Sequence, residues 1–248
     1  MDNYPILVHV MKIPAISGII DRRILVNFTV DPEVIRKIVP APFSPKIYQG
    51  KAIAGICLIR LKHVRPKGLP AFLGIGSENG AHRIAVEWEE GGQLREGVYI
   101  PRRDSSSVFN HLVGERIFPG RHFKAKFDVS EDNGKYHVAF VSSDGTNISV
   151  DAKKAAELNK DSIFKDIEAA SEFFKKGAAG YSPNGTKYDG LLLNTYRWEI
   201  EPLEVTHVSS SFFEDERFFP KGSAKFDNAL LMISIAHEWT SLTDKSCC

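Results

Sequence analysis

Cysteine is scarce in this sequence. The 248 residues include three, Cys57, Cys247 and Cys248, and the last two end the chain. Three thiols cannot build a disulfide framework, so we expect a protein of a reducing compartment, the cytoplasm. The final Cys-Cys pair also fits a lipid-attachment site, but we interpret it as two exposed thiols on a frayed end.

Long apolar runs and a surplus of one charge are also missing. The apolar stretch Ile6–Ile20 is interrupted by Lys12, Pro14 and Gly18 and falls short of the roughly 20 residues that a membrane span needs. No charged region precedes it, as one would in a signal peptide. Basic and acidic residues nearly cancel, at 32 against 31. We therefore expect neither a membrane nor a nucleic acid as partner.

The sequence has no recognisable metal or phosphate motif. Its eight histidines are scattered without HExxH, HxH or CxxC spacing, so we expect no metal and no cofactor. The glycine-rich stretch 74–80 lacks the GxGxxG spacing, and we interpret it as a flexible loop. Ser162–Lys165 matches SxxK but lacks the companion motifs of that site. None of these patterns predicts a catalytic centre.

What the sequence does contain is a series of short β-type segments with few helices between them. Asp132-Asn133-Gly134 joins two of them and is a strong hairpin signal. No repeat or linker divides the chain, so residues 1–248 are expected to form one β-rich α+β domain, mainly antiparallel and either closed or sandwich-like. We expect strands at 23–30, 52–63, 83–88, 97–100, 123–129, 136–142, 147–150, 191–199, 205–213 and 230–235.

Three helices are predicted. The first follows Asp31, a good N-cap, and ends before Pro40. A modest amphipathic pattern predicts the second at Ser107–Ile117. The third, Ser162–Lys176, has the clearest apolar face and Asp161 as its expected N-cap. These helices are expected to lie at the edge of the β structure.

The segment Arg95–Arg103, REGVYIPRR, carries the most concentrated charge pattern. It reads as a short strand that Pro101 stops, followed by Arg102 and Arg103. Two adjacent guanidiniums need a negative partner, which is either a protein carboxylate or a ligand. Neighbouring side chains of a regular strand point to opposite faces, so one of the two should face the interior, unless Pro101 marks a bulge.

Glu78 is the candidate carboxylate. It stands among small residues where the chain leaves the loop and enters a predicted strand. One interpretation is a solvated loop residue, and the other is a carboxylate that opens onto a cavity. The local pattern alone favours the solvated loop residue.

In order and spacing, three motifs resemble the acetoacetate decarboxylase-like superfamily. Its early pattern is similar to Asp21-Arg22 followed by Asp31–Pro42, and its Tyr-x-Glu is similar to Gly76–Glu78. Its Arg-Glu, four residues, Pro-Lys-Lys resembles Arg95–Arg103. Ser171–Pro183 resembles an uncharacterised bacterial branch of that superfamily. The resemblance implies a double barrel or cone of antiparallel strands with a central ligand pocket, and a homo-oligomer.

The sequence departs from the superfamily at its reactive position. The resemblance places the Schiff-base lysine at Arg102 and its neighbouring lysine at Arg103. A guanidinium keeps its proton and is not an amine nucleophile, so Schiff-base decarboxylation is excluded at this position. A lysine from elsewhere, such as Lys62, Lys124 or Lys126, would have to replace it, and no motif supports that.

Two hypotheses of function follow. In the first, the chain binds a small carboxylate or keto acid, with Glu78 and Arg102 as catalytic residues and Arg22, Arg103 and Tyr99 as substrate contacts. Any catalysis would be lyase-like or other acid/base chemistry on a keto acid; whether the protein is an enzyme stays open. In the second, the chain is a non-catalytic or regulatory module for an apolar ligand, and Arg102 and Glu78 simply pair with each other.

Overall fold

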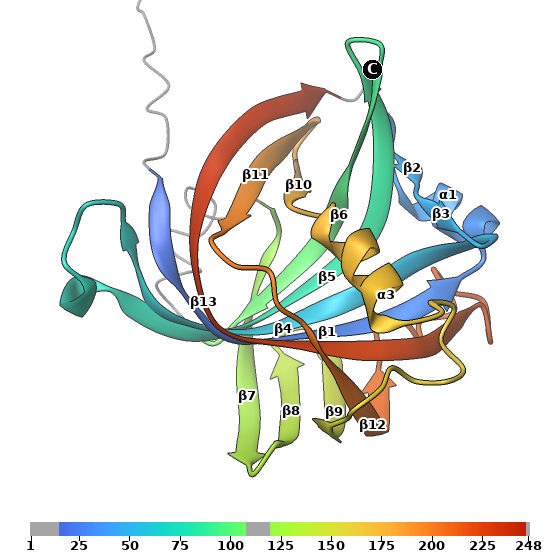
Figure 1. The fold of residues 1–248 in the computed structure, drawn as a ribbon. Coiled ribbons are helices and arrows are strands. Elements are labelled where there is room, and N and C mark those ends of the chain that lie inside the picture. The colour runs from blue at the N-terminus through green and yellow to red at the C-terminus, as the bar shows by residue number, and fades with distance from the viewer. Residues whose placement is uncertain (1–14, 108–119, 247–248) are drawn as a thin grey trace, which may run out of the picture.

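The structure is a computed structural model that describes residues 15–107 and 120–246. The helix predicted at 107–117 lies outside the described residues except for Ser107. The described chain consists mostly of strands (Figure 1). The strands are β1 (Ile16–Val30), β2 (Ser44–Pro45), β3 (Ile47–Tyr48), β4 (Lys51–Pro66), β5 (Ile75–Glu90), β6 (Gln93–Ser105), β7 (His122–Asp132), β8 (Lys135–Ser142), β9 (Asn147–Lys154), β10 (Ala179–Asn184), β11 (Lys187–Thr195), β12 (Glu201–Ser210) and β13 (Ala224–Ser246). The helices are α1 (Pro32–Ile38), α3 (Ile167–Lys175) and the 3₁₀ turn Ala71–Leu73.

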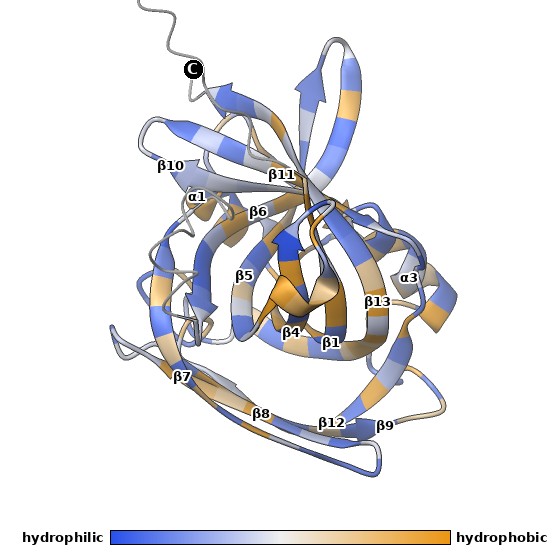
Figure 2. Cartoon of the chain, turned by 90° about the vertical axis from the view of Figure 1, so that its left-hand side faces the viewer, coloured by the Kyte–Doolittle hydropathy of each residue, from blue (hydrophilic) through white to orange (hydrophobic). Residues whose placement is uncertain are grey.

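The strand pairings close two rings that share one set of strands. The order β6-β7-β8-β9-β12-β13-β1-β4-β5 returns to β6 and forms what we call the large ring. The order β6-β10-β11-β13-β1-β4-β5 also returns to β6 and forms the small ring. Figure 2 shows β7, β8 and β12 lying opposite β4 and β1. The predicted β-rich double-barrel class is confirmed, although β6 pairs in parallel with β7 and with β10.

Alternation along the shared strands gives each ring its own core. Ile24 and Val26 of β1 face the large ring and belong to the same apolar cluster as Phe140 of β8, a strand of that ring alone. Leu25, between them, faces the opposite way and packs in the cluster that includes Phe174 of α3. The shared strands are therefore buried on both faces, which explains why they read as apolar runs and not as clean alternations.

Local sequence signals explain the smaller elements. Asp31 caps α1 by accepting a hydrogen bond from the Glu33 backbone N–H, as predicted. Asn133 and Gly134 both have positive φ and form the tight turn between β7 and β8, which confirms the predicted hairpin.

Several sequence-based predictions are wrong. Pro101 does not stop a strand, because β6 continues through it to Ser105. The supposed flexible loop at 74–80 is largely strand, because β5 begins at Ile75 and pairs with β4 over this stretch. The third helix begins at Ile167 and not at Ser162, and Asp166 caps it. The preceding residues are held by Asp227 of β13, which accepts hydrogen bonds from the Ser162 hydroxyl and the Ile163 N–H. Those bonds compete with the helix.

Candidate functional site

The predicted site residues lie in three different places. Arg22 and Glu78 form part of one ion-pair cluster at the large ring, and Arg102 belongs to another. Arg103 follows Arg102 on β6, turns to the opposite face and lines a cavity in the small ring. Tyr99 and Arg102 line a common groove. The structure thus pairs Arg22 with Glu78 and brings Tyr99 close to Arg102, but it does not unite the predicted residues in one pocket.

Arg22 and Glu78 are held together by cross-strand register. Arg22 of β1, Arg60 of β4 and Glu78 of β5 are direct neighbours across the three strands. Arg22 is 1 % exposed, and its Nη2 lies 2.6 Å from Glu78 Oε2. Its Nη1 lies 2.7 Å from Glu131 Oε1, and Arg60 Nε lies 2.5 Å from Glu78 Oε1. Partial burial opposes the charge of Arg60, but the hydrogen bond with Glu78 and the negative charges of Glu78, Glu131 and Asp21 together outweigh it and raise the pKa of Arg60.

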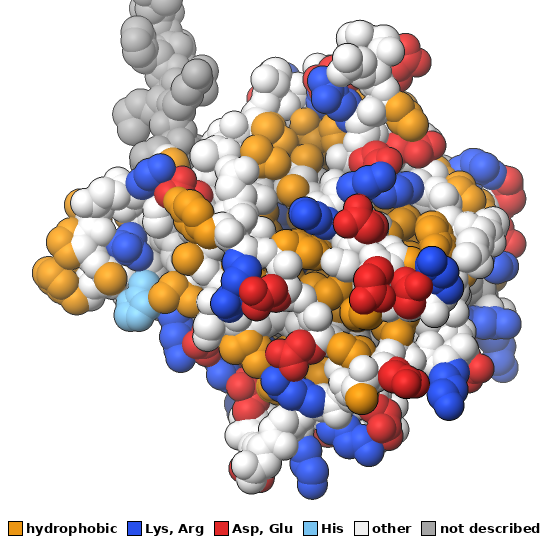
Figure 3. Space-filling view, in the orientation of Figure 1, with side chains coloured by type: hydrophobic (Ala, Val, Ile, Leu, Met, Phe, Trp, Pro, Cys, Tyr) orange, Lys and Arg blue, Asp and Glu red, His pale blue; other side chains and the backbone are white. Residues whose placement is uncertain are grey.

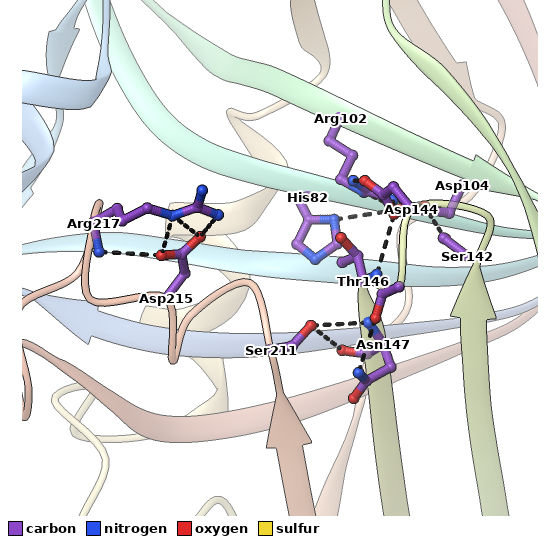
Figure 4. Close-up of polar contacts among 11 residues, drawn as sticks. His82, Arg102, Asp104, Ser142, Asp144, Thr146, Asn147, Ser211, Asp215 and Arg217 are labelled. Atoms are coloured by element: carbon purple, nitrogen blue, oxygen red, sulfur yellow. Dashed lines mark hydrogen bonds and ion pairs between the residues drawn. The ribbon is translucent and has the colours of Figure 1, made fainter.

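Arg102 is bound by two aspartates (Figure 4). Its Nη2 lies 2.7 Å from Asp104 Oδ1, and its Nη1 lies 2.5 Å from Asp144 Oδ2. The guanidinium also stacks 3.8 Å from the centre of the Phe123 ring. The hydrogen bond from Arg102 holds the pKa of the Asp144 carboxyl well below its usual range. The alternative in which Arg102 pairs with Glu78 is therefore wrong: each has other partners.

Asp104 connects this cluster to the core. It is 1 % exposed, accepts a hydrogen bond from the Ser142 hydroxyl, and lies 3.6 Å from Nδ1 of His82. His82 is fully buried, and that burial lowers the pKa of its imidazole despite the nearby carboxylate. The groove beside the cluster, about 400 Å³ in volume, is also lined by Arg121. The ion pairs and hydrogen bonds of this cluster join parts of the same chain and leave little of the Arg102 guanidinium accessible to a ligand.

The small ring contains a cavity of about 100 Å³, and every strand of that ring contributes to its wall. Arg23, Arg83 and Arg103 bring positive charge to this wall, and Cys57 brings a thiol. The remaining wall is mostly apolar and includes Ile20, Ile59, Leu61, Val98, Ile100, Leu191, Leu193 and Trp239.

Two of these arginines surround the thiol. Arg83 Nε lies 3.2 Å from Cys57 Sγ, and Arg23 Nη2 lies 3.5 Å from it. Burial opposes ionisation of the thiol, but the positive charges and hydrogen bonds of the two arginines outweigh it and lower the pKa of Cys57. Burial also lowers the pKa of Arg103, to about 10. The cavity therefore holds concentrated positive charge in surroundings with little water.

Sequence reasoning missed Arg23, Arg83 and Cys57. A signal was present, since Arg83 begins a predicted strand whose next residues are apolar, and Cys57 lies within the long apolar run of β4. A charged residue in a strand buried on both faces must have a partner or a ligand. The sequence alone does not show that both faces of the strand are covered, so this signal could be interpreted only with the structure.

Within residues 15–107 and 120–246, no group of three or more His, Cys, Asp or Glu side chains could hold a metal ion. None of the helices in these ranges has the length and apolarity required to cross a bilayer.

Solved structures identify the class of fold. Acetoacetate decarboxylase from Legionella pneumophila is similar with a TM-score of 0.59 and 12% identity, over 93% of this chain and 88% of that one. An acetoacetate decarboxylase-like enzyme from Sphingomonas wittichii RW1 gives 0.58 and 11%, over 94% of each chain. The enduracididine biosynthesis enzyme MppR, complexed with pyruvate, gives 0.54 and 13%, over 98% and 95%. The chain thus has the acetoacetate decarboxylase-like fold, as its motifs predicted.

A family model gives the particular assignment. Residues 20–234 match DUF2071, described as an uncharacterized conserved protein, and the chain belongs to this family. The predicted membership of an uncharacterised branch of the superfamily is confirmed. A comparison with curated proteins found no match.

Proposed function

We propose that the chain binds a small organic acid, such as a keto acid, in the cavity of the small ring. The observation that supports this most is the placement of Arg23, Arg83 and Arg103 around one apolar space. Asp104 is the one carboxylate among the described residues that line it, and Asp104 bonds to Arg102. An anion in this space would gain charge-assisted hydrogen bonds where little water competes.

The size of the cavity favours a small ligand over a lipid. A volume of about 100 Å³ is well below the roughly 300–1,000 Å³ of sites for drug-sized ligands. A fatty acid would need more room, which weighs against the alternative of a module for an apolar ligand. MppR, a structural neighbour, was solved with pyruvate, a keto acid of this size class.

In this proposal the predicted site is reassigned. Arg103 remains a substrate contact and is joined by Arg23 and Arg83. Catalytic roles for Glu78 and Arg102, and substrate contacts by Arg22 and Tyr99, stay predictions; the ion pairs of Arg22, Glu78 and Arg102 favour a structural role. The expected homo-oligomer, cytoplasmic location and single domain over residues 1–248 likewise stay predictions.

The test is a thermal-shift comparison with pyruvate and acetoacetate. A ligand that binds only the folded state at a hundredfold excess over Kd adds about 2.7 kcal/mol, which for a chain of this size raises Tm by roughly 5–10 °C. We expect that shift in the wild type and in Arg36→Gln, which removes an equal charge from the exposed helix α1. Arg103→Gln should abolish it.

The same experiment separates the two arginines. If Arg102→Gln loses the shift and Arg103→Gln retains it, the anion site lies in the groove beside Arg102 and our assignment is wrong. A shift with fatty acids alone would support the apolar-ligand module instead.

Borohydride trapping with acetoacetate, read by intact mass, should give no adduct, because Arg102 and Arg103 occupy the positions of the lysine pair.

A further inference from the structure

A second space, which we call the vestibule, adjoins the cavity at the end of α3. Its volume is about 260 Å³, and it shares Arg23, Gly177, Ala178 and Leu193 with the cavity wall. Because these four residues line both spaces, the two spaces lie against each other.

The vestibule carries positive charge of its own. Lys175, in the last turn of α3, and Arg197, after β11, both line it and are exposed. No acidic residue is among the described residues that line it. Arg197 Nε lies 3.3 Å from the Glu199 carboxylate, but that pair is exposed and contributes little, so Arg197 can exchange this partner for a ligand. Figure 3 shows the side of the molecule that carries α3, with basic, acidic and hydrophobic side chains interspersed.

The two spaces together match a longer ligand than the cavity alone. Their combined volume reaches the lower end of the roughly 300–1,000 Å³ range of typical small-molecule sites. Both spaces are lined by cations: Arg83 and Arg103 line the cavity, Lys175 and Arg197 line the vestibule, and Arg23 lines both. A ligand that fills this space gains most if it carries an acidic group at each end.

We infer that the ligand is a dicarboxylic acid, bound with one carboxylate in the cavity and the other in the vestibule. The inference rests on the proposed function, because it places the first carboxylate on the same arginines. It adds Lys175 and Arg197 as the residues that distinguish a dicarboxylate from a monocarboxylate of equal length. Exposed charge contacts are individually weak, so we expect the two together to give roughly tenfold tighter binding, which corresponds to about 1.4 kcal/mol.

Cys57 provides a built-in reporter for the test. Its thiol lies on the cavity wall, so a bound acid should shield it from iodoacetamide. Cys247→Ser and Cys248→Ser remove the other two thiols of the chain. In this background the rate of Cys57 alkylation, followed by mass spectrometry, is measured against increasing 2-oxovalerate or 2-oxoglutarate, which are keto acids of equal carbon number with one and two carboxylates.

We expect 2-oxoglutarate to protect Cys57 at about tenfold lower concentration than 2-oxovalerate. The double variant Lys175→Gln/Arg197→Gln should remove this advantage and leave protection by 2-oxovalerate unchanged. Lys176→Gln is the matched control, because it removes a neighbouring charge that does not line the vestibule.

The outcomes separate this inference from the proposed function. Equal protection by the two acids overturns the dicarboxylate inference and leaves the cavity as an anion site. Protection by neither acid, together with no thermal shift from either, overturns both. If iodoacetamide does not reach Cys57, the same pair of acids and variants is compared by thermal shift, with the same tenfold difference as the criterion.

Discussion

Adjacent arginines on the shared strands have different surroundings because successive side chains of a strand point to opposite faces. Arg22 is bound by Glu78 and Glu131 at the large ring, whereas Arg23 reaches the cavity of the small ring. Arg102 and Arg103 repeat this division on β6. The arginines at the large ring are therefore ion-paired within the chain, Arg22 with Glu78 and Glu131 and Arg102 with Asp104 and Asp144.

Burial also controls titration at the residue scale. His237 of β13 is 1 % exposed, and burial lowers the pKa of its imidazole from 6.5 to about 4. Its ring lies against Trp239, and the positive charge of Arg23 also disfavours protonation. The unfolded chain then binds a proton at pH values where the folded one does not, so stability should fall as pH decreases from about 6.5 to 4. The loss from His237 is at most roughly 3 kcal/mol.

Urea unfolding at several pH values between 7 and 4 measures this loss. His237→Gln should show a smaller decline over that interval. Part of the decline will remain, because burial lowers the pKa of His82 in the same direction. An identical decline in both proteins would contradict the assignment.

At this scale, the sequence predicted the charge of the site better than its position. The two adjacent arginines after Pro101 indicated that anionic partners are required. Arg102 is paired with Asp104 and Asp144, and Arg103 lines the cavity in which we propose an anionic ligand. Which arginine meets which anion depends on strand register and on what covers each face. A single sequence does not contain that information.

At the scale of elements, tertiary hydrogen bonds set the beginning of α3. The sequence pattern at 162–176 is helical, but the Asp227 carboxylate on β13 accepts hydrogen bonds from the Ser162 hydroxyl and the Ile163 N–H. The helix therefore begins later, with Asp166 as its N-cap. The apolar face was predicted correctly, since Phe173 and Phe174 are buried against the shared strands. The helical sequence pattern thus located the helix, but its first residue was set by hydrogen bonds to Asp227, which is distant in sequence.

Two aspartate substitutions test this boundary. Asp166 Oδ1 accepts a hydrogen bond from the Ala169 N–H at 2.8 Å, so Asp166→Ala should lower the free energy of unfolding by about 1 kcal/mol. Asp161→Ala removes the same charge from an exposed position in the preceding turn and should change stability by less than about 0.5 kcal/mol. Urea titration gives both values. A larger loss for Asp161→Ala would mean that the helix begins at Ser162.

At the scale of the whole molecule, the fold is two rings that cannot be separated without breaking shared strands. The β-type segments and the absence of a linker predicted one β-rich domain, and the motifs predicted the double-barrel class. The closure of both rings was not predictable, because β6, which pairs with β5 along a long antiparallel ladder, joins β7 and β10 only through short parallel contacts. The shared strands carry buried apolar residues on both faces, such as Ile24 and Leu25 of β1.

A shared sheet predicts cooperative unfolding. Phe140 lies in the large ring alone and packs against Gly80 of β5, where an added Cβ would lie 2.7 Å from the Phe140 ring. Leu191 lies in the small ring alone. Phe140→Ala should cost about 3–5 kcal/mol and Leu191→Ala about 2–5 kcal/mol. Because both rings use β13, β1, β4, β5 and β6, each substitution should destabilise the entire molecule.

Urea unfolding followed by far-UV circular dichroism and by tryptophan fluorescence measures this coupling. Trp239 lines the cavity of the small ring, so in a Trp88→Phe/Trp198→Phe background its fluorescence reports on that ring, while circular dichroism averages over both. We expect coincident single transitions in the wild type and an equal shift of both probes in each variant. Two transitions, with the tryptophan signal unmoved by Phe140→Ala, would instead mean that the rings unfold as separate domains. Coincidence would support the single domain predicted from the sequence, because a fold with shared strands has no boundary along which half of it can open.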